Sequence, residues 1–378
     1  MYFSIHNYSL LRKLHTLYES INFNGLSNLI TFEFSDKNQL KITWGLDSKN
    51  LVYTYINIKK YNKNKEKITL SIKLMMDILT TFSNEKLYIK KKKNTLNIYS
   101  KHGTYEVPIF CNSNYDQPLT HRSIFVKINL CSNIFLKILN NTLFIEDVSE
   151  LKPILNGVFF QFFYNKANFI STDTYRLVKY TIKNIKTNKN VQFTISRKYL
   201  SIIKTILKKE KKSFIVIEYY DNNNIIFRFK NHIFSCQLIN EKYPNFYSTI
   251  THNECKASVI INKFLLLNTI KRICVFSKRK NKFVNLHFNH EKLKIRDQNR
   301  IDRDSPVSEI QCKTLFKKVK NIKIGFNSQF LIEILSFLNE DFIYFELYDK
   351  MGILRPSYNK NKKEKESIFI LIMSTIKV

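Results

Sequence analysis

The chain has 378 residues, of which 44% are hydrophobic and 14% aromatic. This composition suits a globular protein of two or three domains, because single cores stop growing at roughly 250–300 residues. The 62 Lys and Arg residues against 30 Asp and Glu residues give a formal net charge of +32, which favours nucleic acid as a partner and, second, an anionic membrane surface. Abundant Lys, Asn and Ile residues indicate that general compositional drift accounts for part of this charge.

The sequence predicts a cytoplasmic protein without a metal site. No apolar run approaches the roughly 20 residues that span a bilayer, and the first ten residues, MYFSIHNYSL, lack the features of a signal peptide. The six cysteines are scattered without a CxxC pair, so neither a zinc site nor a disulfide framework is predicted. His287 and His290 lie in an expected strand–turn–strand segment, where a surface turn is favoured over metal ligation. There is no P-loop, GxGxxG or GxSxG motif.

Amphipathic helices recur along the chain, each after a short strand-like run. Three segments begin in this way, at residues 3–21, 126–142 and 258–277. A second helix follows each of them, at residues 69–82, 193–207 and 324–338. Their predicted core positions recur at nearly equal intervals: Leu74, Ile78 and Phe82; Leu200, Ile203 and Leu207; Leu331, Ile334 and Leu338. Alternating strand pairs follow each second helix.

This internal repeat predicts an α+β protein of three similar domains, each built from two strand–helix–strand halves. The expected domains are residues 1–124, 125–252 and 253–378. Several helices carry cations opposite the apolar stripe, and for one helix an ordinary solvated face would explain them. If six such helices curve together, their charges form one basic surface. A surface that contacts phosphates without reading bases binds DNA regardless of sequence.

Five segments resemble the beta subunit of bacterial DNA polymerase III, the sliding clamp, in the order of that family: LKPILNGVFFQF (151–162), STDTYRLV (171–178), FSCQLINEKYPNF (234–246), IGFNSQFLIEIL (324–335) and FILIMSTIKV (369–378). The resemblance implies three clamp domains that close head to tail with a second copy into a ring, the first domain of one copy against the third of the other. Helices would line the hole and sheets the outside. Such a homodimer encircles duplex DNA and gives the polymerase processivity, without catalysis or a cofactor.

In clamps, the segment that matches STDTYRLV borders a hydrophobic cleft between the second and third domains. The polymerase alpha subunit, the clamp loader, and other polymerases and repair proteins dock a short peptide there. Carried over by position, the predicted peptide site consists of Leu155, Thr172, Thr174, Tyr175, Arg176, Leu177, Pro244, Phe246, Phe330, Met351, Leu371, Ile372, Met373 and Ser374. Asp173 and Arg176 would then serve as structural and rim residues, and not as catalysts.

The chain departs from the family at several positions of this site. Clamps usually have Gly-His where this chain has Thr174-Tyr175, and a proline where it has Ser374. Because threonine adds bulk and removes conformational freedom at a turn, we expect a different peptide preference. Clamps also tend to be acidic outside, whereas this chain carries a basic excess. The predicted DNA-facing cations are Lys137, Lys152, Arg197, Lys198 and Lys204.

Two other functions stay open on the residues alone. A metal-dependent phosphoryl-transfer enzyme needs clustered carboxylates, and the best candidates are Asp297, Asp302, Asp304 and Glu309. They lie among arginines in an expected loop between strands, so a solvated loop is favoured. The main alternative is a basic, sequence-independent DNA-binding or structural protein of clamp fold with reduced partner binding. A membrane binder is not favoured, because the apolar helix stripes are needed for the domain cores.

Overall fold

The computed structural model describes most of the chain. The described residues are 1–21, 28–35, 37–47, 49–62, 66–110, 124–145, 152–210, 213–220, 223–251, 254–276, 283–289, 291–297, 306–317, 321–357 and 365–374. Contacts divide the chain into two compact units. The first unit comprises Met1–Leu139 and Ile195–Asn240, and the second comprises Asn140–Thr194 and Glu241–Val378. Among the described residues, no helix is both long and apolar enough to cross a membrane.

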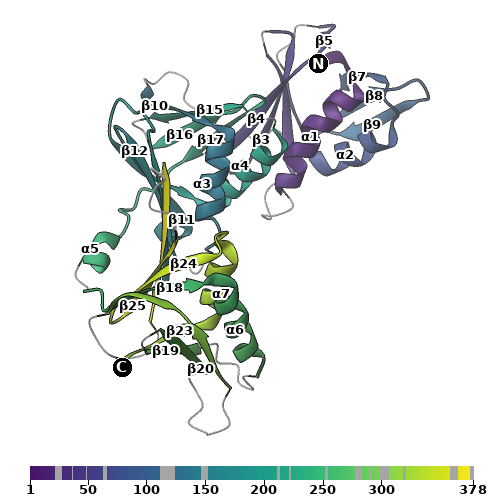
Figure 1. Cartoon of the computed structure of the whole chain (residues 1–378). Coiled ribbons are helices and arrows are strands. Elements are labelled where there is room, and N and C mark those ends of the chain that lie inside the picture. Colours follow the sequence, from purple (N-terminus) through teal and green to yellow (C-terminus); the bar gives the residue numbers. More distant parts are fainter. Residues whose placement is uncertain are drawn as a thin grey trace. The chain divides into compact units, whose positions relative to one another are not determined.

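The first unit contains two sheets (Figure 1). Their strands are β1 (Tyr2–His6), β2 (Leu29–Phe34), β3 (Gln39–Gly45), β4 (Leu51–Asn57), β5 (Lys59–Lys60), β6 (Lys67–Ser71), β7 (Lys86–Lys92), β8 (Thr95–Tyr99), β9 (Thr104–Pro108), β10 (Ile124–Cys131), β15 (Phe214–Tyr220), β16 (Asn224–Arg228) and β17 (His232–Gln237). One sheet has the order β5-β1-β7-β8-β9, and the other β10-β15-β16-β17-β4-β3-β2-β6. Since β17 pairs with β4, the larger sheet runs across the predicted boundary at residue 124.

The second unit contains the other two sheets. Their strands are β11 (Gly157–Phe163), β12 (Lys166–Thr172), β13 (Arg176–Lys183), β14 (Val191–Ser196), β18 (Ala257–Asn262), β19 (Phe283–Asn289), β20 (Lys292–Asp297), β21 (Val307–Gln311), β22 (Lys313–Lys317), β23 (Asn321–Asn327), β24 (Phe342–Leu347), β25 (Met351–Pro356) and β26 (Glu366–Met373). The sheet orders are β14-β11-β12-β13-β26-β25-β24-β18-β22 and β21-β20-β19-β23. Since β13 pairs with β26, the larger sheet joins strands from the second and third predicted domains.

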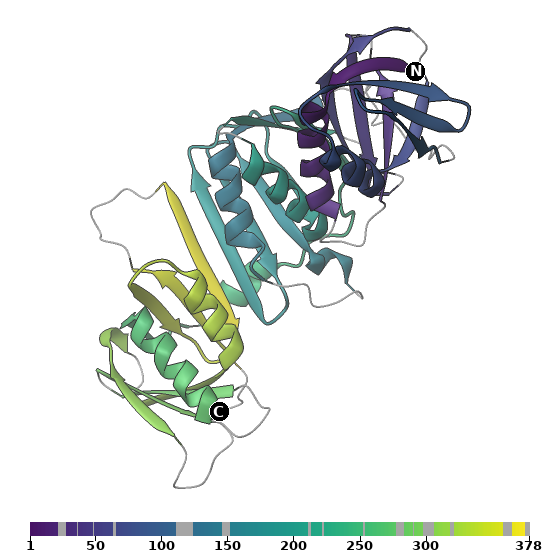
Figure 2. The ribbon, with the colours of Figure 1, turned by 90° about the vertical axis from the view of Figure 1, so that its right-hand side faces the viewer.

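The helices confirm the predicted α+β fold. They are α1 (Asn7–Ile21), α2 (Ile72–Thr81), α3 (Ser132–Thr142), η1 (Pro153–Asn156), α4 (Arg197–Lys209), α5 (Phe246–Thr251), α6 (Lys263–Phe276) and α7 (Ser328–Phe337). Six of them directly follow a strand, in the pairs β1–α1, β6–α2, β10–α3, β14–α4, β18–α6 and β23–α7. Helix α1 packs against α2, and α6 packs against α7 (Figures 1 and 2). The two boundaries between the three expected domains stay a prediction, because a large sheet runs across each of them.

Side-chain caps set the start of several helices. Asn327 Oδ1 accepts hydrogen bonds from the backbone N–H groups of Gln329 and Phe330 at the start of α7. Asn262 Oδ1 accepts one from Leu265 N at the start of α6, at 3.0 Å. These bonds satisfy donors that the first turn of a helix leaves without an intrahelical partner.

The predicted helix cores are confirmed in α4 and α7 and wrong in α2. Leu200, Ile203 and Leu207 of α4 are buried, as are Leu331 and Ile334 of α7 and Leu338 just after it. In α2, however, Leu74 and Ile78 are half-buried, and so is Phe82, which follows the helix. The buried residues of α2 are Ile72, Met75, Met76 and Leu79. This helix is apolar on two neighbouring sides, so its periodicity did not decide which side faces the core.

A hydrogen-bonded cluster in the first unit ties α4 to the loop after β3. Asp47 accepts hydrogen bonds from the Tyr199 hydroxyl (2.7 Å) and from the backbone N–H groups of Lys49 and Asn50, both at 2.9 Å. Partial burial raises the pKa of the Asp47 carboxyl, but these donors outweigh it, so the pKa lies below its ordinary value. A carboxylate with a depressed pKa stabilises the fold above its unfolded pKa, and this contribution disappears as the pH falls.

We expect Tyr199→Phe to lower the free energy of unfolding by about 1 kcal/mol at neutral pH, because the Asp47 carboxylate loses a donor. The difference from the parent protein should begin to shrink at about pH 3, because the carboxyl takes up a proton first in the variant and only at lower pH in the parent, where its pKa is more strongly depressed. Urea unfolding followed by circular dichroism at the two pH values measures this. An equal difference at both pH values would show that the hydrogen bond is not coupled to the Asp47 charge.

Candidate functional site

Asp173 and Arg176 fix the turn between β12 and β13, and both are almost completely buried, with 1% and 3% of their surface exposed. Asp173 Oδ1 accepts hydrogen bonds from the backbone N–H groups of Tyr175 (2.9 Å) and Arg176 (2.5 Å). Asp173 Oδ2 accepts from Arg176 Nε at 2.7 Å. An aspartate that binds backbone groups two and three residues ahead is typical of a tight turn. Both side chains therefore hold the turn in place.

Arg176 also joins this turn to helix α7. Its Nη1 atom forms an ion pair with Glu333, and its guanidinium carbon lies 4.0 Å from the ring centroid of Phe330. Two carboxylates and an aromatic face compensate for the removal of this cation from water. Glu333 was not among the predicted site residues. Its place one helical turn after Phe330 is the signal in the sequence that points to it.

The residues of the predicted peptide site divide into exposed and buried groups. Tyr175 is 55% exposed, Thr174 and Pro244 are exposed, and Phe330, Met373 and Ser374 are half-buried. The buried members, each at most 8% exposed, are Leu155, Thr172, Arg176, Leu177, Phe246, Met351, Leu371 and Ile372. The buried members therefore belong to the core under the site, and the exposed and half-buried members are available to a partner.

The half-buried members of the predicted site, Phe330, Met373 and Ser374, lie close to the exposed Tyr175. The ring centroids of Tyr175 and Phe330 are 6.2 Å apart. The Tyr175 carbonyl accepts a hydrogen bond from Met373 N, and the Lys350 carbonyl accepts one from Ser374 N, both at 2.8 Å. The end of β26 thus lies beside the turn after β12 and the start of α7. We call Tyr175, Phe330, Met373 and Ser374 the aromatic rim.

Helix α5 carries the YPNF part of the predicted site. Phe246 begins this helix, and its ring centroid lies 4.2 Å from that of Tyr247. The Tyr247 hydroxyl accepts a hydrogen bond from Lys179 Nζ of β13 at 3.1 Å, and Tyr243 stacks on Phe159 of β11 at 4.6 Å between ring centroids. These contacts hold α5 beside the sheet strands that lead to the aromatic rim.

Thr174 stands where clamps usually have glycine, and its φ angle is 76°. This left-handed backbone conformation is unfavourable for a β-branched residue. Its N–H donates to Thr172 Oγ1 at 3.2 Å, and the Thr172 hydroxyl donates to the Arg176 carbonyl at 2.7 Å. The hydrogen bonds of the turn therefore hold Thr174 in a strained conformation.

We expect Thr174→Gly to raise the free energy of unfolding by about 1 kcal/mol, since relief of the strain exceeds the greater freedom of glycine in the unfolded chain. Urea denaturation followed by circular dichroism measures the change. The control is Thr205→Gly inside helix α4, which should lower stability by a similar amount. Destabilisation by Thr174→Gly would mean that the turn is not strained.

The predicted DNA-facing cations differ in their exposure. Lys137, Lys152 and Lys198 are exposed, and Lys204 is half-buried. Burial lowers the pKa of Lys204, and nearby Lys208 lowers it further.

The prediction that Arg197 faces DNA is wrong for this chain, because Arg197 is only 4% exposed. Arg197 opens helix α4 and precedes Leu200 by three residues. It therefore lies on the same face of the helix as the buried apolar stripe.

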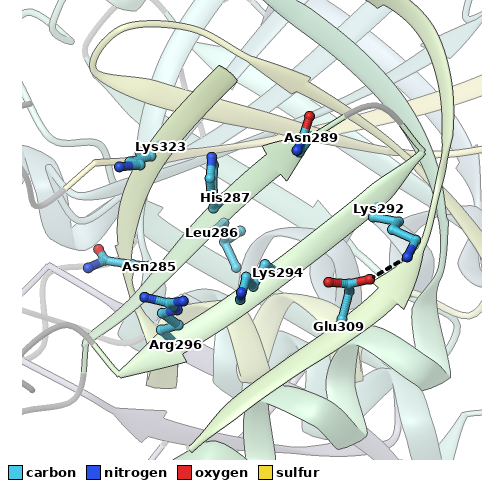
Figure 3. Close-up of a pocket in the computed structure, with 9 residues that line it drawn as sticks. All are labelled: Asn285, Leu286, His287, Asn289, Lys292, Lys294, Arg296, Glu309 and Lys323. Atoms are coloured by element: carbon cyan, nitrogen blue, oxygen red, sulfur yellow. Dashed lines mark ion pairs between the residues drawn. The ribbon is translucent and has the colours of Figure 1, made fainter. Parts of the chain in front are cut away.

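A hollow of about 660 Å³ lies on the four-stranded sheet of the second unit (Figure 3). It is lined by Asn285, Leu286, His287, Asn289, Lys292, Lys294, Arg296, Glu309 and Lys323. Register places Lys323, His287 and Lys294 side by side on neighbouring strands. Glu309 forms an ion pair with Lys292 at 2.8 Å, shown by the dashed line in Figure 3. The hollow is therefore predominantly cationic.

Of the carboxylates that a phosphoryl-transfer enzyme would need, the two that the structure describes, Asp297 and Glu309, are not gathered into a cluster. Glu309 faces lysines, and Asp297 is buried at the end of β20. Asp302, Asp304 and His290 lie outside the described residues. In the part of the chain that the structure describes, no group of three or more His, Cys, Asp or Glu side chains could hold a metal ion.

Comparison with known proteins agrees with the fold. Residues 129–245 match the family model of the DNA polymerase III beta subunit, central domain, and residues 248–368 match that of its C-terminal domain. The chain is 23% identical over 375 residues to the beta sliding clamp of Mycoplasma capricolum, covering 96% of this chain and 98% of that protein. It is 24% identical over 314 residues to the beta sliding clamp of Rickettsia felis, covering 81% of each.

Solved structures show the same architecture along the whole chain. The DNA polymerase III subunit beta from Pseudomonas aeruginosa superposes with a TM-score of 0.85 at 17% identity, and 100% of both chains is covered. The beta subunit from Thermotoga maritima gives a TM-score of 0.83 at 14% identity with the same coverage. Since the two family models together match more than half of the chain, and relatives align over nearly all of it, the chain belongs to the DNA polymerase III beta subunit family, the beta sliding clamps.

Proposed function

We propose that the chain is the non-catalytic processivity subunit of the replicative DNA polymerase, and that it encircles duplex DNA as a ring of two copies. The observation that carries this proposal is the strand–helix pair that recurs six times on sheets continuous across the predicted domain boundaries. This architecture matches clamp structures from end to end. As a subunit that works on the bacterial chromosome, it would act in the cytoplasm.

Strands β9 and β21 suit the expected contact between the first domain of one copy and the third domain of the other. Each is a five-residue strand at the end of its sheet. Tyr105 of β9 is 42% exposed and Val307 of β21 is 43% exposed. Exposed strand edges favour aggregation, and pairing β9 with β21 of a second copy would cover both edges. Two such contacts would close a symmetric ring.

The exposed and half-buried lysines of the helices would hold DNA loosely inside the ring. Lys137, Lys198 and Lys204 remain in the proposed DNA-facing set, together with Lys152. Contacts that are long-ranged and independent of base sequence permit sliding, whereas tight contacts to base edges would prevent it. Any binding to linear DNA should therefore weaken steeply as the salt concentration rises.

The aromatic rim, together with Pro244 of the predicted peptide site, would bind a short peptide of the polymerase alpha subunit, the clamp loader, or other polymerases and repair proteins. Two exposed or half-exposed rings above a buried apolar layer provide the anchor contacts that dominate such interfaces. The rigid Asp173–Arg176–Glu333 unit keeps Tyr175 and Phe330 in position, which lowers the entropy cost of binding.

DNA retention tests the proposed function. The protein is loaded on nicked circular DNA, with its clamp loader or at high concentration, and the circle is then linearised. We expect stable retention on circles and rapid release from the linear form, because a ring can leave only over a DNA end. Equal retention on both forms would mean ordinary electrostatic adhesion, and the protein would then be a basic DNA-binding protein of clamp fold.

A further inference from the structure

The five-stranded sheet of the first unit exposes a side that consists largely of tyrosines and lysines. Along β1, β7 and β8 one set of alternating residues is buried, including Phe3, Leu87 and Ile98. On the opposite side Ser4 and Asn97 are buried, but the other residues of this set, together with residues of and just after β5, are exposed or half-buried. We call this set the tyrosine–lysine face, and its members are Tyr2, Lys59, Tyr61, Lys86, Tyr88, Lys90, Lys92 and Tyr99.

Strand register brings these residues together from distant parts of the chain. Tyr2 of β1 lies opposite Lys90 of β7, and Tyr88 of β7 lies opposite Tyr99 of β8. Tyr61 is attached to β1 through its N–H, which donates to the Tyr2 carbonyl at 3.0 Å. The strands β7, β8 and β9 of this sheet are labelled in Figure 1.

The tyrosine rings form a continuous row on this face. The ring centroid of Tyr61 lies 4.7 Å from that of Tyr2 and 6.1 Å from that of Tyr88, with interplanar angles of 32° and 30°. Tyr61 is 40% exposed and Tyr88 is 39% exposed. Single exposed aromatic side chains are normal on soluble proteins, whereas a contiguous group of them marks a binding site.

Each tyrosine of the face has a lysine ammonium above its ring. The distances from Nζ to the ring centroid are 5.6 Å for Lys90 and Tyr2, 5.8 Å for Lys59 and Tyr61, 5.6 Å for Lys86 and Tyr88, and 6.0 Å for Lys92 and Tyr99. Cation–π contacts are weak at exposed sites, so the lysines are free to turn towards a phosphate. On the same side of β9, Glu106 accepts a hydrogen bond from Asn97 at 2.7 Å. The four lysines of the face outnumber this one carboxylate, so the face carries an excess of positive charge.

This combination fits single-stranded nucleic acid better than other partners. Unpaired bases stack on aromatic rings whatever their identity, while lysines neutralise the phosphates between them. Antiparallel sheets with exposed aromatic residues bind RNA single strands in this manner. The bases of a duplex are already stacked and cannot reach the rings. An acidic peptide would use the lysines but would leave the row of rings without a stacking partner.

We propose that the tyrosine–lysine face binds single-stranded nucleic acid, with bases stacked on Tyr2, Tyr61 and Tyr88 and phosphates bound by the lysines. The proposal depends on the proposed function only for the source of the ligand, because a clamp that serves a replicative polymerase meets unpaired template DNA. Binding is independent of base sequence, since the face offers rings and cations.

Fluorescence anisotropy of the full-length chain with labelled oligothymidine tests the proposal. We expect Tyr61→Ala and Tyr88→Ala each to weaken binding by at least about fivefold, the lower limit for loss of one base–aromatic stack. Tyr61→Phe and Tyr88→Phe should bind like the parent protein, because they keep the rings. The matched control is Tyr164→Ala, which removes a tyrosine that is 64% exposed in the second unit and should leave the affinity unchanged.

Three results would overturn the proposal. The first is parental affinity for oligothymidine in both alanine variants. The second is equally tight binding of an abasic chain or of a duplex of the same length, which would mean phosphate contact alone. The third is a loss of polyglutamate binding in the alanine variants without a loss of oligothymidine binding, which would identify a protein-docking surface. Retention on circular DNA is measured in parallel. If the parent protein is not retained on circles, this counts against the proposed ring and not against binding of single strands by this face.

Discussion

Replacing Arg176 with methionine should lower the free energy of unfolding by about 3–5 kcal/mol, the usual cost of removing one partner from a buried ion pair. Asp173 would keep its charge with no exposed side-chain surface and without the hydrogen bond from Arg176 Nε. Methionine fills much of the same volume, so the loss reflects charge and hydrogen bonding more than a cavity. Urea denaturation followed by circular dichroism measures the change.

The matched control for this variant is Arg355→Met. Arg355 donates to Glu346 at 3.0 Å, but its side chain is 45% exposed, so the expected loss is at most about 1 kcal/mol. Adding Asp173→Asn to Arg176→Met should recover part of the stability, because no unpaired charge is then buried. A loss in Arg176→Met as small as that of the control would show that the turn does not depend on this ion pair.

Phe330→Ala should weaken binding of a peptide from the polymerase alpha subunit by about 30-fold, a typical effect for an aromatic anchor at the centre of an interface. Phe330 packs against the guanidinium of Arg176, and its ring centroid lies 6.2 Å from that of Tyr175, so its loss removes one anchor and loosens the other. Isothermal titration calorimetry with the isolated peptide measures the affinity. Retention on circular DNA should stay at the parental level.

The control for Phe330→Ala is Phe342→Ala in β24 of the same unit. Phe342 is 50% exposed and lies outside the predicted peptide site. We expect its replacement to leave peptide affinity within about threefold of the parent, as for most surface residues away from an anchor. If both variants bind the peptide equally well, the aromatic rim is not the docking site.

The fold class could be read from the sequence because hydrophobic periodicity is a local property. The stripes Leu200–Ile203–Leu207 and Leu331–Ile334–Leu338 were correct, and each strand–helix pair has both its elements close together in the chain. Periodicity failed in α2, where Met75 and Met76 are buried beside a second apolar stripe of similar strength. It also failed for Arg197, since a cation at a helix start was taken as exposed although its position continues the buried stripe.

The resemblance to clamps supplied the residues of the predicted peptide site, but only the tertiary structure shows which of them are buried and which are exposed. Ile372 and Met351 have almost no exposed surface, whereas Tyr175 is exposed, because the pairing of β13, β25 and β26 decides which side chains are covered. The ion pair between Arg176 and Glu333 joins residues 157 positions apart, a distance over which no local pattern acts.

The tyrosine–lysine face shows most clearly that local sequence patterns do not determine which distant residues become neighbours. The alternation in β7 predicts that one set of side chains faces solvent, but it does not predict which strands lie beside β7. The row of Tyr2, Tyr61 and Tyr88 exists because β1 pairs with both β5 and β7. Local periodicity thus specified the elements and their buried sides, while the long-range pairing of strands determined which exposed residues became neighbours.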